Sequence, residues 1–251
     1  MSDHELHLGD CLAGMAGMAD KSVDVTITDP PFSAHVHAML GKEQAVGRES
    51  RDALTFDAID PAVAAAVARE VCRVTKRWAL FFCDDRVLHL WIAAVESYGW
   101  AFVRGGIWIK PDAMPQMSGD RPSTGAEHIV IAHAPKRGRM RWNGGGRPAV
   151  WNCGIERKDR VHPTQKPLDL MEALVSDFTD PGEVILDPFA GSGTTLVACK
   201  RLGRSAIGWE RDPAFHAAAV RRIDAAREQL SFPQGKRTKP KQSALALGKT
   251  P

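Results

Sequence analysis

The most informative part of this sequence is VILDPFAGSGTT, residues 184–195. It begins as a short apolar run typical of a buried strand and passes through a glycine-rich turn into a helical pattern over 194–202. Gly191 and Gly193 allow the backbone to come close to a bound group, and the free N–H groups at a helix start can hold an acceptor. The stretch therefore predicts a strand, a cofactor-binding turn and a helix.

The turn lacks the marks of a diphosphate-binding loop. No lysine follows Gly193, and Leu196 stands where G-x-G-x-x-G would place its third glycine. Glu210 follows Asp187 by 23 residues (210 − 187), at the end of the next predicted strand, where it can accept hydrogen bonds from ribose hydroxyls. Together these features predict a cofactor that carries a nucleoside without a diphosphate.

Strand and helix patterns alternate along the rest of the chain. We predict strands at 23–28, 78–83, 102–109, 129–132, 184–186 and 206–209, and helices at 61–75, 85–98, 167–178, 194–202 and 213–230. Residues 32–57 show no clear period and are expected to form a loop or a short irregular helix. Such alternation predicts an α/β fold with an open, mostly parallel sheet and helices on both faces, which binds ligands at the carboxyl ends of its strands.

A second strand end carries the sequence Asp29-Pro30-Pro31-Phe32. Two prolines stop ladder pairing and make a rigid turn. This turn presents a carboxylate, a fixed carbonyl at Pro30 and a flat ring at Phe32. Such a set suits a planar base that carries an amine.

Composition narrows the class of protein. The chain has 251 residues, 25% of them charged, and a formal net charge of +3, which neither demands nor excludes a polyanionic partner. The five cysteines form no CxxC pair and the nine histidines form no HExxH pattern, so we expect no metal site. No apolar run approaches the roughly 20 residues of a membrane helix, so we expect a cytoplasmic protein with no membrane partner.

Basic residues gather between positions 136 and 160, together with tryptophans and a glycine triplet. We predict that this segment contacts DNA through Lys136, Arg137, Arg139, Arg141, Arg147, Arg157, Lys158 and Arg160. A solvated basic loop is the alternative. Residues 232–251 form a basic tail that is expected to be disordered and that either attracts phosphates or serves only as a soluble terminus.

The two strand ends resemble the motifs of a known family. Asp29 to Phe32 resembles the D/N/S-P-P-Y/F catalytic motif of amino-group DNA methyltransferases, and Asp187 to Thr195 resembles their S-adenosylmethionine motif. The catalytic motif precedes the cofactor motif by 158 residues (187 − 29), with HPTQKP at 162–167 just upstream of the latter, as in the beta class. Gly9-Asp10-Cys11 looks like the start of the family pattern.

The resemblance implies a Rossmann-like S-adenosylmethionine-dependent methyltransferase fold, with a mostly parallel seven-stranded sheet. The catalytic domain would span 1–231 and hold a small target-recognition region at about 111–160. Its implied catalytic residues are Asp29, Pro30, Pro31 and Phe32. Its implied cofactor site comprises Asp10, Cys11, Asp29, Thr164, Gln165, Lys166, Asp187, Phe189, Ala190, Gly191, Ser192, Gly193, Thr194, Glu210 and Arg211.

The implied activity is methyl transfer from S-adenosylmethionine to an exocyclic amine of a base flipped out of double-stranded DNA. The leading Asp29 favours N6 of adenine, and N4 of cytosine stays open. Methylation at cytosine carbon is excluded because no cysteine follows a proline. A nicotinamide-dependent oxidoreductase, a non-enzymatic DNA-binding protein and an RNA or protein amide methyltransferase are the other classes considered. A bacterial or phage-encoded enzyme of restriction-modification type, held at the nucleoid by its DNA, fits this interpretation, and a homodimer stays open.

Overall fold

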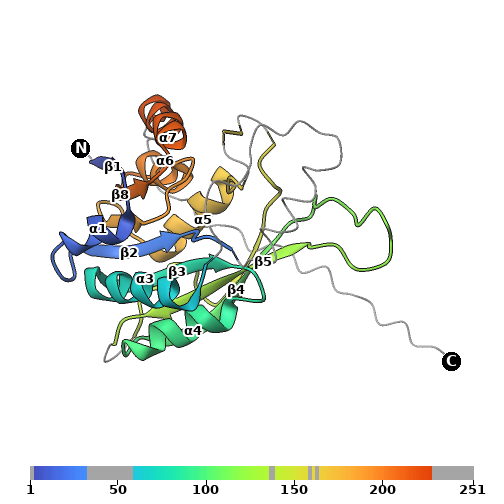
Figure 1. Ribbon diagram of the computed structural model, residues 1–251, viewed down its shortest axis with the longest axis horizontal. Helices are drawn as coiled ribbons and strands as arrows, with labels where there is room; N and C mark the ends of the chain where they lie inside the picture. The colour runs from blue at the N-terminus through green and yellow to red at the C-terminus, as the bar shows by residue number, and fades with distance from the viewer. Residues whose placement is uncertain (1–2, 33–58, 136–138, 158–159, 162–163, 228–251) are drawn as a thin grey trace.

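A computed structural model describes residues 3–32, 59–135, 139–157, 160–161 and 164–227 of the chain. Its centre is an eight-stranded sheet with the strand order β1-β8-β7-β2-β3-β5-β4-β6 (Figure 1). The strands are β1 (His4–Leu8), β2 (Val23–Thr28), β3 (Thr75–Cys83), β4 (Ala101–Ile109), β5 (Ala126–His133), β6 (Val150–Asn152), β7 (Val184–Asp187) and β8 (Ser205–Glu210).

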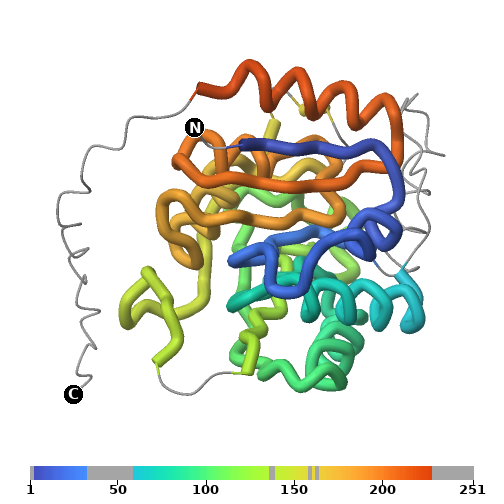
Figure 2. The backbone as a smooth tube through the Cα atoms, turned by 90° about the vertical axis from the view of Figure 1, so that its left-hand side faces the viewer, coloured from blue at the N-terminus to red at the C-terminus, as the bar shows by residue number. Residues whose placement is uncertain are grey.

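The sheet is mostly parallel, as predicted. Among the described strands β5 alone runs against the others, because it pairs antiparallel with both β3 and β4 while the remaining pairings are parallel. The resemblance implies seven strands and the sheet has eight, of which the sequence pattern predicts six. The two strands without a predicted counterpart are β1, whose residues are half-buried or exposed, and β6, which is only three residues long. Figure 2 shows β1 and β8, from opposite ends of the chain, lying side by side.

Helices cover both faces of the sheet, which confirms that part of the prediction. On one face α1 (Cys11–Ala16), α3 (Pro61–Val74) and α4 (Leu88–Ser97) share a core with buried Phe81 and Trp91. On the other face α5 (Leu168–Phe178), α6 (Thr194–Arg201) and α7 (Pro213–Ala225) pack over buried Leu80 and Ile185. The strands between the two layers are therefore buried on both sides, which explains their continuous apolar runs.

Local capping sets the helix starts. Asp60 caps α3 by accepting a hydrogen bond from Val63 N at 2.9 Å, with Pro61 in the first turn. Asp212 and Pro213 begin α7 in the same way. Helix α4 begins three residues later than predicted because Asp84 holds a turn through Arg86 N at 2.8 Å.

Helix α7 ends earlier than the predicted residue 230. Its last residue is Ala225, and Ala226 already has an extended backbone. Most of the predicted irregular segment 32–57 and the whole tail 232–251 lie outside the described residues.

The parallel strands all end on one side of the sheet and begin on the opposite side. We call these two sides the carboxyl edge and the amino edge. At the carboxyl edge lie the ends of β2, β7, β8 and β4, and at the amino edge lie their beginnings. The predicted recognition region crosses between these edges. The loop 110–125 projects from the carboxyl edge (Figure 1), β5 then runs to the amino edge, and β6 returns. The basic segment is thus divided: Arg141, Asn143 and Arg147 contact the end of α5 and the turn after it near the amino edge, and residues 153–161 follow β6 at the carboxyl edge.

Candidate active site

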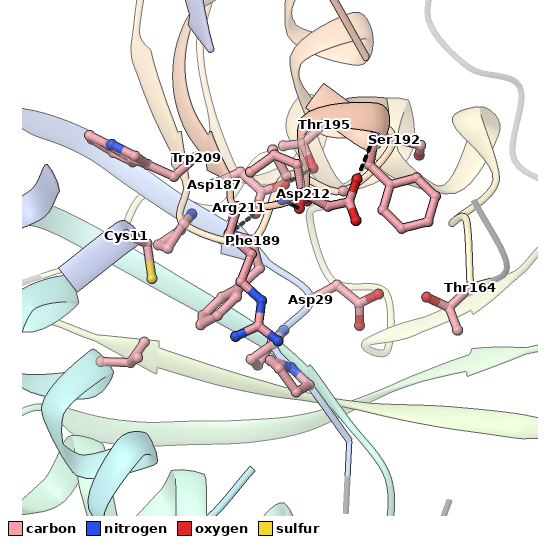
Figure 3. A pocket seen from close by; sticks show the side chains of 18 of the residues that line it. Cys11, Asp29, Thr164, Asp187, Phe189, Ser192, Thr195, Trp209, Arg211 and Asp212 are labelled. Atoms are coloured by element: carbon pink, nitrogen blue, oxygen red, sulfur yellow. Dashed lines mark hydrogen bonds between the residues drawn. The ribbon is translucent and has the colours of Figure 1, made fainter. Parts of the chain in front are cut away.

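A pocket of about 360 Å³ opens at the carboxyl edge (Figure 3). Its lining includes Asp29 to Phe32 and every residue of the implied cofactor site except Gly193. Four of the lining segments lie at strand ends: residues 9–12 at β1, 29–32 at β2, 187–195 at β7 and 209–212 at β8. The structure therefore brings together the two motifs that lie 158 residues apart (187 − 29) in the sequence.

The glycine-rich turn has the backbone that its sequence predicts. Gly191 and Gly193 have φ angles of 53° and 74°, a region that disfavours residues with a Cβ. Gly193 is also the N-cap residue of α6, so the turn leads directly into the helix start. Gly193 does not line the pocket; a Cβ there would come within 3.0 Å of Ala219 Cβ. Its role is close packing against α7.

Asp187 holds this turn in place. Its Oδ1 accepts hydrogen bonds from Thr28 Oγ1 at 2.8 Å and from Phe189 N at 3.2 Å, and its Oδ2 accepts one from Thr195 Oγ1 at 2.5 Å. Burial raises the pKa of Asp187 to about 6, against the hydrogen bonds from Thr195 and Thr28. Both carboxylate oxygens are engaged inside the protein, so Asp187 shapes the cofactor turn.

Two further acids lie at the ends of the neighbouring strands β1 and β8. Gly9 N donates to Glu210 O at 2.9 Å, which brings Asp10 and Glu210 to the same side of the pocket. Glu210 Oε1 accepts a hydrogen bond from Asp212 N at 2.7 Å, and burial raises the pKa of its carboxyl group. Asp10 Oδ1 caps α1 through Ala13 N at 3.0 Å. These acids offer acceptors for the hydroxyls and the amine of a nucleoside.

Apolar residues that the sequence analysis did not predict form much of the pocket wall. They lie in α3, α5, β8 and α7 or just before α3, and comprise Ile59, Val63, Val67, Met171, Trp209 and Phe215. Cys11 adds to this wall, because burial raises the pKa of its thiol to about 12 and keeps it protonated. In sequence these residues look like ordinary core positions. Only the folded chain shows that they face a cavity with room for a flat ring.

Asp29 lies at the end of β2 and its carboxylate points into the pocket (Figure 3). Oδ2 accepts a hydrogen bond from Lys166 Nζ at 2.7 Å, whereas buried Oδ1 has no hydrogen-bond partner among the described residues. Burial raises the pKa of Asp29 to about 6; Lys166 opposes this rise and the nearby Glu127 adds to it. A carboxylate with one bound and one open oxygen is prepared to accept a hydrogen bond from an amine.

Lys166 is the buried cation beside Asp29. Its Nζ also lies 3.0 Å from Glu127 Oε2, and Glu127 Oε1 lies 2.6 Å from Lys110 Nζ. The ammonium sits 4.9 Å from the ring centre of Phe32, within cation–π range. Desolvation lowers the pKa of Lys166, but its two acids raise it above the ordinary value, so it stays charged.

Glu127 and Lys110 belong to this site although the sequence analysis did not single them out. They lie on β5 and directly after β4, and these two strands pair only in the folded sheet. Desolvation raises the pKa of Glu127, but Lys166 and Lys110 together hold it below its usual range. No sequence pattern connects these two residues with Asp29, because each contact joins segments that are far apart in the chain.

The five predicted DNA-binding residues that the structure describes lie at two separate places. Lys136, Arg137 and Lys158 lie outside the described residues, and Arg139 is exposed near the amino edge. Arg141 pairs with Asp180 and Arg147 with Asp177, both at the amino edge beside the end of α5. Arg157 and Arg160 are exposed at the carboxyl edge. Arg157 Nη2 also donates to Asp112 O at 2.8 Å, which ties its segment to the loop 110–125.

Known proteins resemble this chain over most of its length. A family model described as DNA methylase matches residues 23–221. Escherichia coli (strain K12) YubD, whose name describes it as a methylase, is 30% identical over 225 residues, covering 88% of this chain and 91% of that protein. The type II methyltransferase M.XycI of Xanthomonas campestris pv. cyanopsidis is 31% identical over 140 residues, which cover 52% of this chain and 47% of that protein.

Solved structures share the fold. The crystal structure of the M1.HpyAVI–SAM complex matches with a TM-score of 0.66 and 26% identity, covering 87% of this chain and 98% of that one. TTHA0409 of Thermus thermophilus, described as a DNA modification methylase, matches with a TM-score of 0.63 and 26% identity over 91% and 97% of the two chains. The cytosine-N4-specific PvuII DNA methyltransferase has a TM-score of 0.68 over 89% and 87%, but at 16% identity it shows the fold alone.

The sheet, the glycine-rich turn and the acid at the end of β2 define a Rossmann-like, S-adenosylmethionine-dependent methyltransferase. Since the family model covers most of its length, the chain belongs to the N6/N4 DNA methylase family, and the predicted resemblance is confirmed. The family uses S-adenosylmethionine as its methyl donor. In the described part of the chain, no helix has the length and apolar character needed to cross a membrane.

Proposed function

We propose that this protein methylates N6 of adenine in double-stranded DNA, with Asp29 as the acceptor that holds the target amine. The observation that carries the proposal is the buried Oδ1 of Asp29, which has no hydrogen-bond partner among the described residues and belongs to a side chain that lines the pocket with Phe32 and the cofactor turn. An orphaned buried acceptor costs about 1–3 kcal/mol, and a donor from the substrate removes that cost. Adenine brings such a donor on its exocyclic nitrogen.

The residues of the pocket suit S-adenosylmethionine. Glu210 is placed for the ribose hydroxyls, Asp10 for the adenine amine, and the N–H groups of the turn around Gly191 for the carboxylate of the methionine part. The apolar wall with Val63 and Phe215 would lie against the flat adenine. When bound, this cofactor supplies a methyl group that its positive sulfur has already activated.

The protein contributes position and a suitable field to the transfer. The flipped base stacks on Phe32 and donates its amine hydrogens to Asp29 Oδ1 and to the Pro30 carbonyl. This arrangement directs the nitrogen lone pair toward the activated methyl, and Lys166 holds the other oxygen of Asp29 in place. Asp29 must be ionised to accept two donors, so the pKa of about 6 that burial gives it predicts activity above that pH.

The choice of N6 of adenine rests on the leading acid of the Asp29-Pro30-Pro31-Phe32 motif, which the resemblance associates more often with adenine. N4 of cytosine is the second candidate, because the PvuII enzyme that shares this fold is specific for it. Both bases present an amine beside a ring nitrogen. Both reactions would therefore use the same Asp29 geometry.

The proposed DNA-binding surface is smaller than the one predicted from the sequence, because it includes only the arginines at the carboxyl edge. Arg157 and Arg160 are exposed at this edge, beside the loop 110–125. Arg141 and Arg147 pair with Asp180 and Asp177 at the other edge, whereas the acid that pairs with Arg157, Asp112, lies at the carboxyl edge itself. We therefore infer that DNA lies across the carboxyl edge and contacts Arg157 and Arg160.

The test is a labelling experiment with methyl-tritiated S-adenosylmethionine and duplex DNA of mixed sequence, followed by digestion to nucleosides and mass spectrometry. We expect labelled N6-methyldeoxyadenosine, and no label with Asp29→Asn. Label on N4-methyldeoxycytidine would overturn the base assignment and keep the Asp29 mechanism. Unlabelled DNA from a protein that binds the cofactor, measured by calorimetry, would contradict the proposal and direct the search to RNA or protein amides.

A further inference from the structure

Glu127 stands outside the family motifs recognised in the sequence, yet it belongs to the buried charges behind Asp29. Its two oxygens lie 3.0 Å from Lys166 Nζ and 2.6 Å from Lys110 Nζ. The side chains of Glu127, Lys166 and Lys110 are 16%, 7% and 15% exposed. With Asp29 they form an alternating row of two acids and two lysines with no net charge, which is how buried charges are tolerated.

Lys166 contacts two acids, Asp29 and Glu127, and these two contacts fix the direction in which its ammonium group points. An ammonium has three tetrahedral donors, and buried Glu127 engages one side of it while Asp29 Oδ2 engages another at 2.7 Å. Phe32 and Phe82 flank the same ammonium, with ring centres 4.9 Å and 5.0 Å from Nζ. The lysine is thus held where it reaches one oxygen of Asp29 and leaves the other without a partner among the described residues.

We propose that Glu127 is a positioning residue for methyl transfer: through Lys166 it keeps Oδ1 of Asp29 open to the target amine. Without the charge of Glu127, Lys166 would have Asp29 as its single acid and could approach both of its oxygens. An Asp29 carboxylate bridged in this way would compete poorly for the amine. This proposal rests on the proposed function of Asp29.

The test uses Glu127→Gln, which keeps the shape of the side chain and removes its charge. Asp29 faces Lys166, Glu127 and Lys110, and it lies close enough to Asp187 for their charges to interact. Loss of the negative charge of Glu127 should therefore lower the pKa of Asp29 below about 6. We expect a roughly 10-fold lower kcat, an unchanged KM for the cofactor and an acid limb of the rate profile at lower pH, with Glu127→Asp restoring part of the rate.

A second readout needs no substrate. Carboxyl ¹³C NMR titration of Asp29, assigned with Asp29→Asn, should show the same downward shift in Glu127→Gln. Glu183→Gln is the matched control, because Glu183 is a half-buried acid that pairs with Arg77 at 2.5 Å at the amino edge. Glu183→Gln should leave the titration of Asp29 unchanged. An Asp29 titration and a kcat in Glu127→Gln equal to those of the unmodified protein would overturn the proposal, whereas unlabelled DNA would overturn only the proposed function.

A different observation points to a second role at the same edge. Among the large exposed apolar residues, Met114 and Met117 are 67% and 84% exposed, and both lie in the loop 110–125. The loop is ordered: Lys110 N donates to Gly125 O at 2.9 Å at its neck, and Ile155 N donates to Asp112 Oδ1 at 2.9 Å. An ordered loop thus presents two exposed methionines beside the carboxyl edge.

The partner that fits is the base stack of duplex DNA. The neck of the loop is Lys110, which the pair Glu127 and Lys166 connects to Asp29. Arg121 and Arg157 lie beside the methionines and pair with Asp120 and Asp112, but more than half of each arginine side chain stays exposed and offers donors to phosphates. Apolar side chains that enter a base stack ease the removal of a base from it. We infer that Met117 is a wedge that enters the duplex when the target base leaves, which also rests on the proposed function.

The wedge is tested with Met117→Ala on the target duplex identified by the labelling experiment. We expect a kcat/KM at least about 10-fold lower on the paired duplex, but close to that of the unmodified protein on a duplex with a mismatch opposite the target, where unstacking costs less. The rise in 2-aminopurine fluorescence at the target position should shrink in parallel. Met140→Ala is the control, since Met140 is 36% exposed at the amino edge. Equal losses on both duplexes, or no loss, would overturn the wedge, while unlabelled DNA would overturn the proposed function itself.

Discussion

The two edges of the sheet use charged residues in opposite ways. At the amino edge Arg77 pairs with Glu183 at 2.5 Å, and Asp177 accepts from Arg147 and from Trp151 Nε1. At the carboxyl edge the pair of Lys166 and Asp29 leaves one buried oxygen without a partner among the described residues. Completed pairs fix structure, and an incomplete pair is available to a substrate.

The amino edge shows what the predicted basic segment does there. Asn143 Nδ2 donates to Ser176 O at 3.1 Å and to Thr179 O at 3.0 Å, so it satisfies carbonyls at the end of α5. Trp142 packs edge-on against Phe178, with 4.9 Å between ring centres. This half of the segment secures the end of a helix, and the half at the carboxyl edge is the one that we propose to contact DNA.

The largest effect is expected for Asp29→Asn, which removes the charge of the incomplete pair at the carboxyl edge. The amide keeps the size of the side chain but loses the charge that would hold the amine, and its NH₂ cannot accept. We expect methyl transfer to fall by roughly 10²–10³-fold, as for the loss of a preorganised polar group. Cofactor affinity by calorimetry should stay within a few-fold. A variant that retains most of the turnover would show that Asp29 does not hold the amine.

The rate profile tests the same carboxyl group by pH. Burial raises the pKa of Asp29 to about 6, so the group is protonated and inactive below that pH and ionised above it. We expect kcat/KM to fall about 10-fold per pH unit well below 6 and to level off above 7. The opposite sign holds for stability, because a raised carboxyl pKa makes ionisation destabilising. The profile of Glu183→Gln at the amino edge should be the same as that of the unmodified protein.

Loss of a completed pair at the amino edge should lower the stability of the protein rather than its activity. In Asp177→Ala the buried acceptor of Arg147 and of Trp151 is lost, and an indole N–H is left buried. We expect a loss of roughly 2–3 kcal/mol in the free energy of unfolding, since both hydrogen bonds involve a charged group. Urea unfolding measures this loss, and kcat at a temperature well below the transition should be unchanged. If the fall in kcat, expressed as a free energy, exceeded the loss in the free energy of unfolding, the proposed distinction between the two edges would be wrong.

The sequence predicts the strand ends much better than the surfaces around them. The motifs at Asp29 and Asp187 lie within single segments, so local patterns place both at the carboxyl edge. The contact of Glu127 with Lys166, by contrast, depends on how β5 pairs with its neighbours, which no local pattern encodes. The basic segment also looks continuous in sequence, but it passes from the end of α5 to the carboxyl end of β4, where the three-residue strand β6 pairs with Ile107–Ile109. The apolar wall around Val63 has the helical spacing of an ordinary core face.

Glu210→Gln should have a smaller effect, confined to the cofactor. The amide keeps one acceptor but loses the charge, so its hydrogen bonds with ribose hydroxyls weaken. We expect the cofactor Kd to rise about 10-fold, equivalent to about 1.4 kcal/mol, with little change in kcat at saturation. Isothermal calorimetry with S-adenosylhomocysteine measures the Kd without turnover. An unchanged Kd would place the ribose elsewhere in the pocket.

The smallest expected effects concern two arginines of the same predicted segment, one at each edge of the sheet. Their comparison tests directly which edge contacts DNA. Arg141 is 56% exposed and pairs with Asp180 at the amino edge, so Arg141→Ala should cost at most about 1 kcal/mol of stability and leave DNA affinity unchanged. Arg160→Ala, at the carboxyl edge, should weaken DNA binding several-fold and reduce the slope of log affinity against log salt by about 1. Fluorescence anisotropy over a series of salt concentrations compares the two variants directly. Equal losses would mean that DNA reaches the amino edge as well, and the division of labour between the edges would then be wrong.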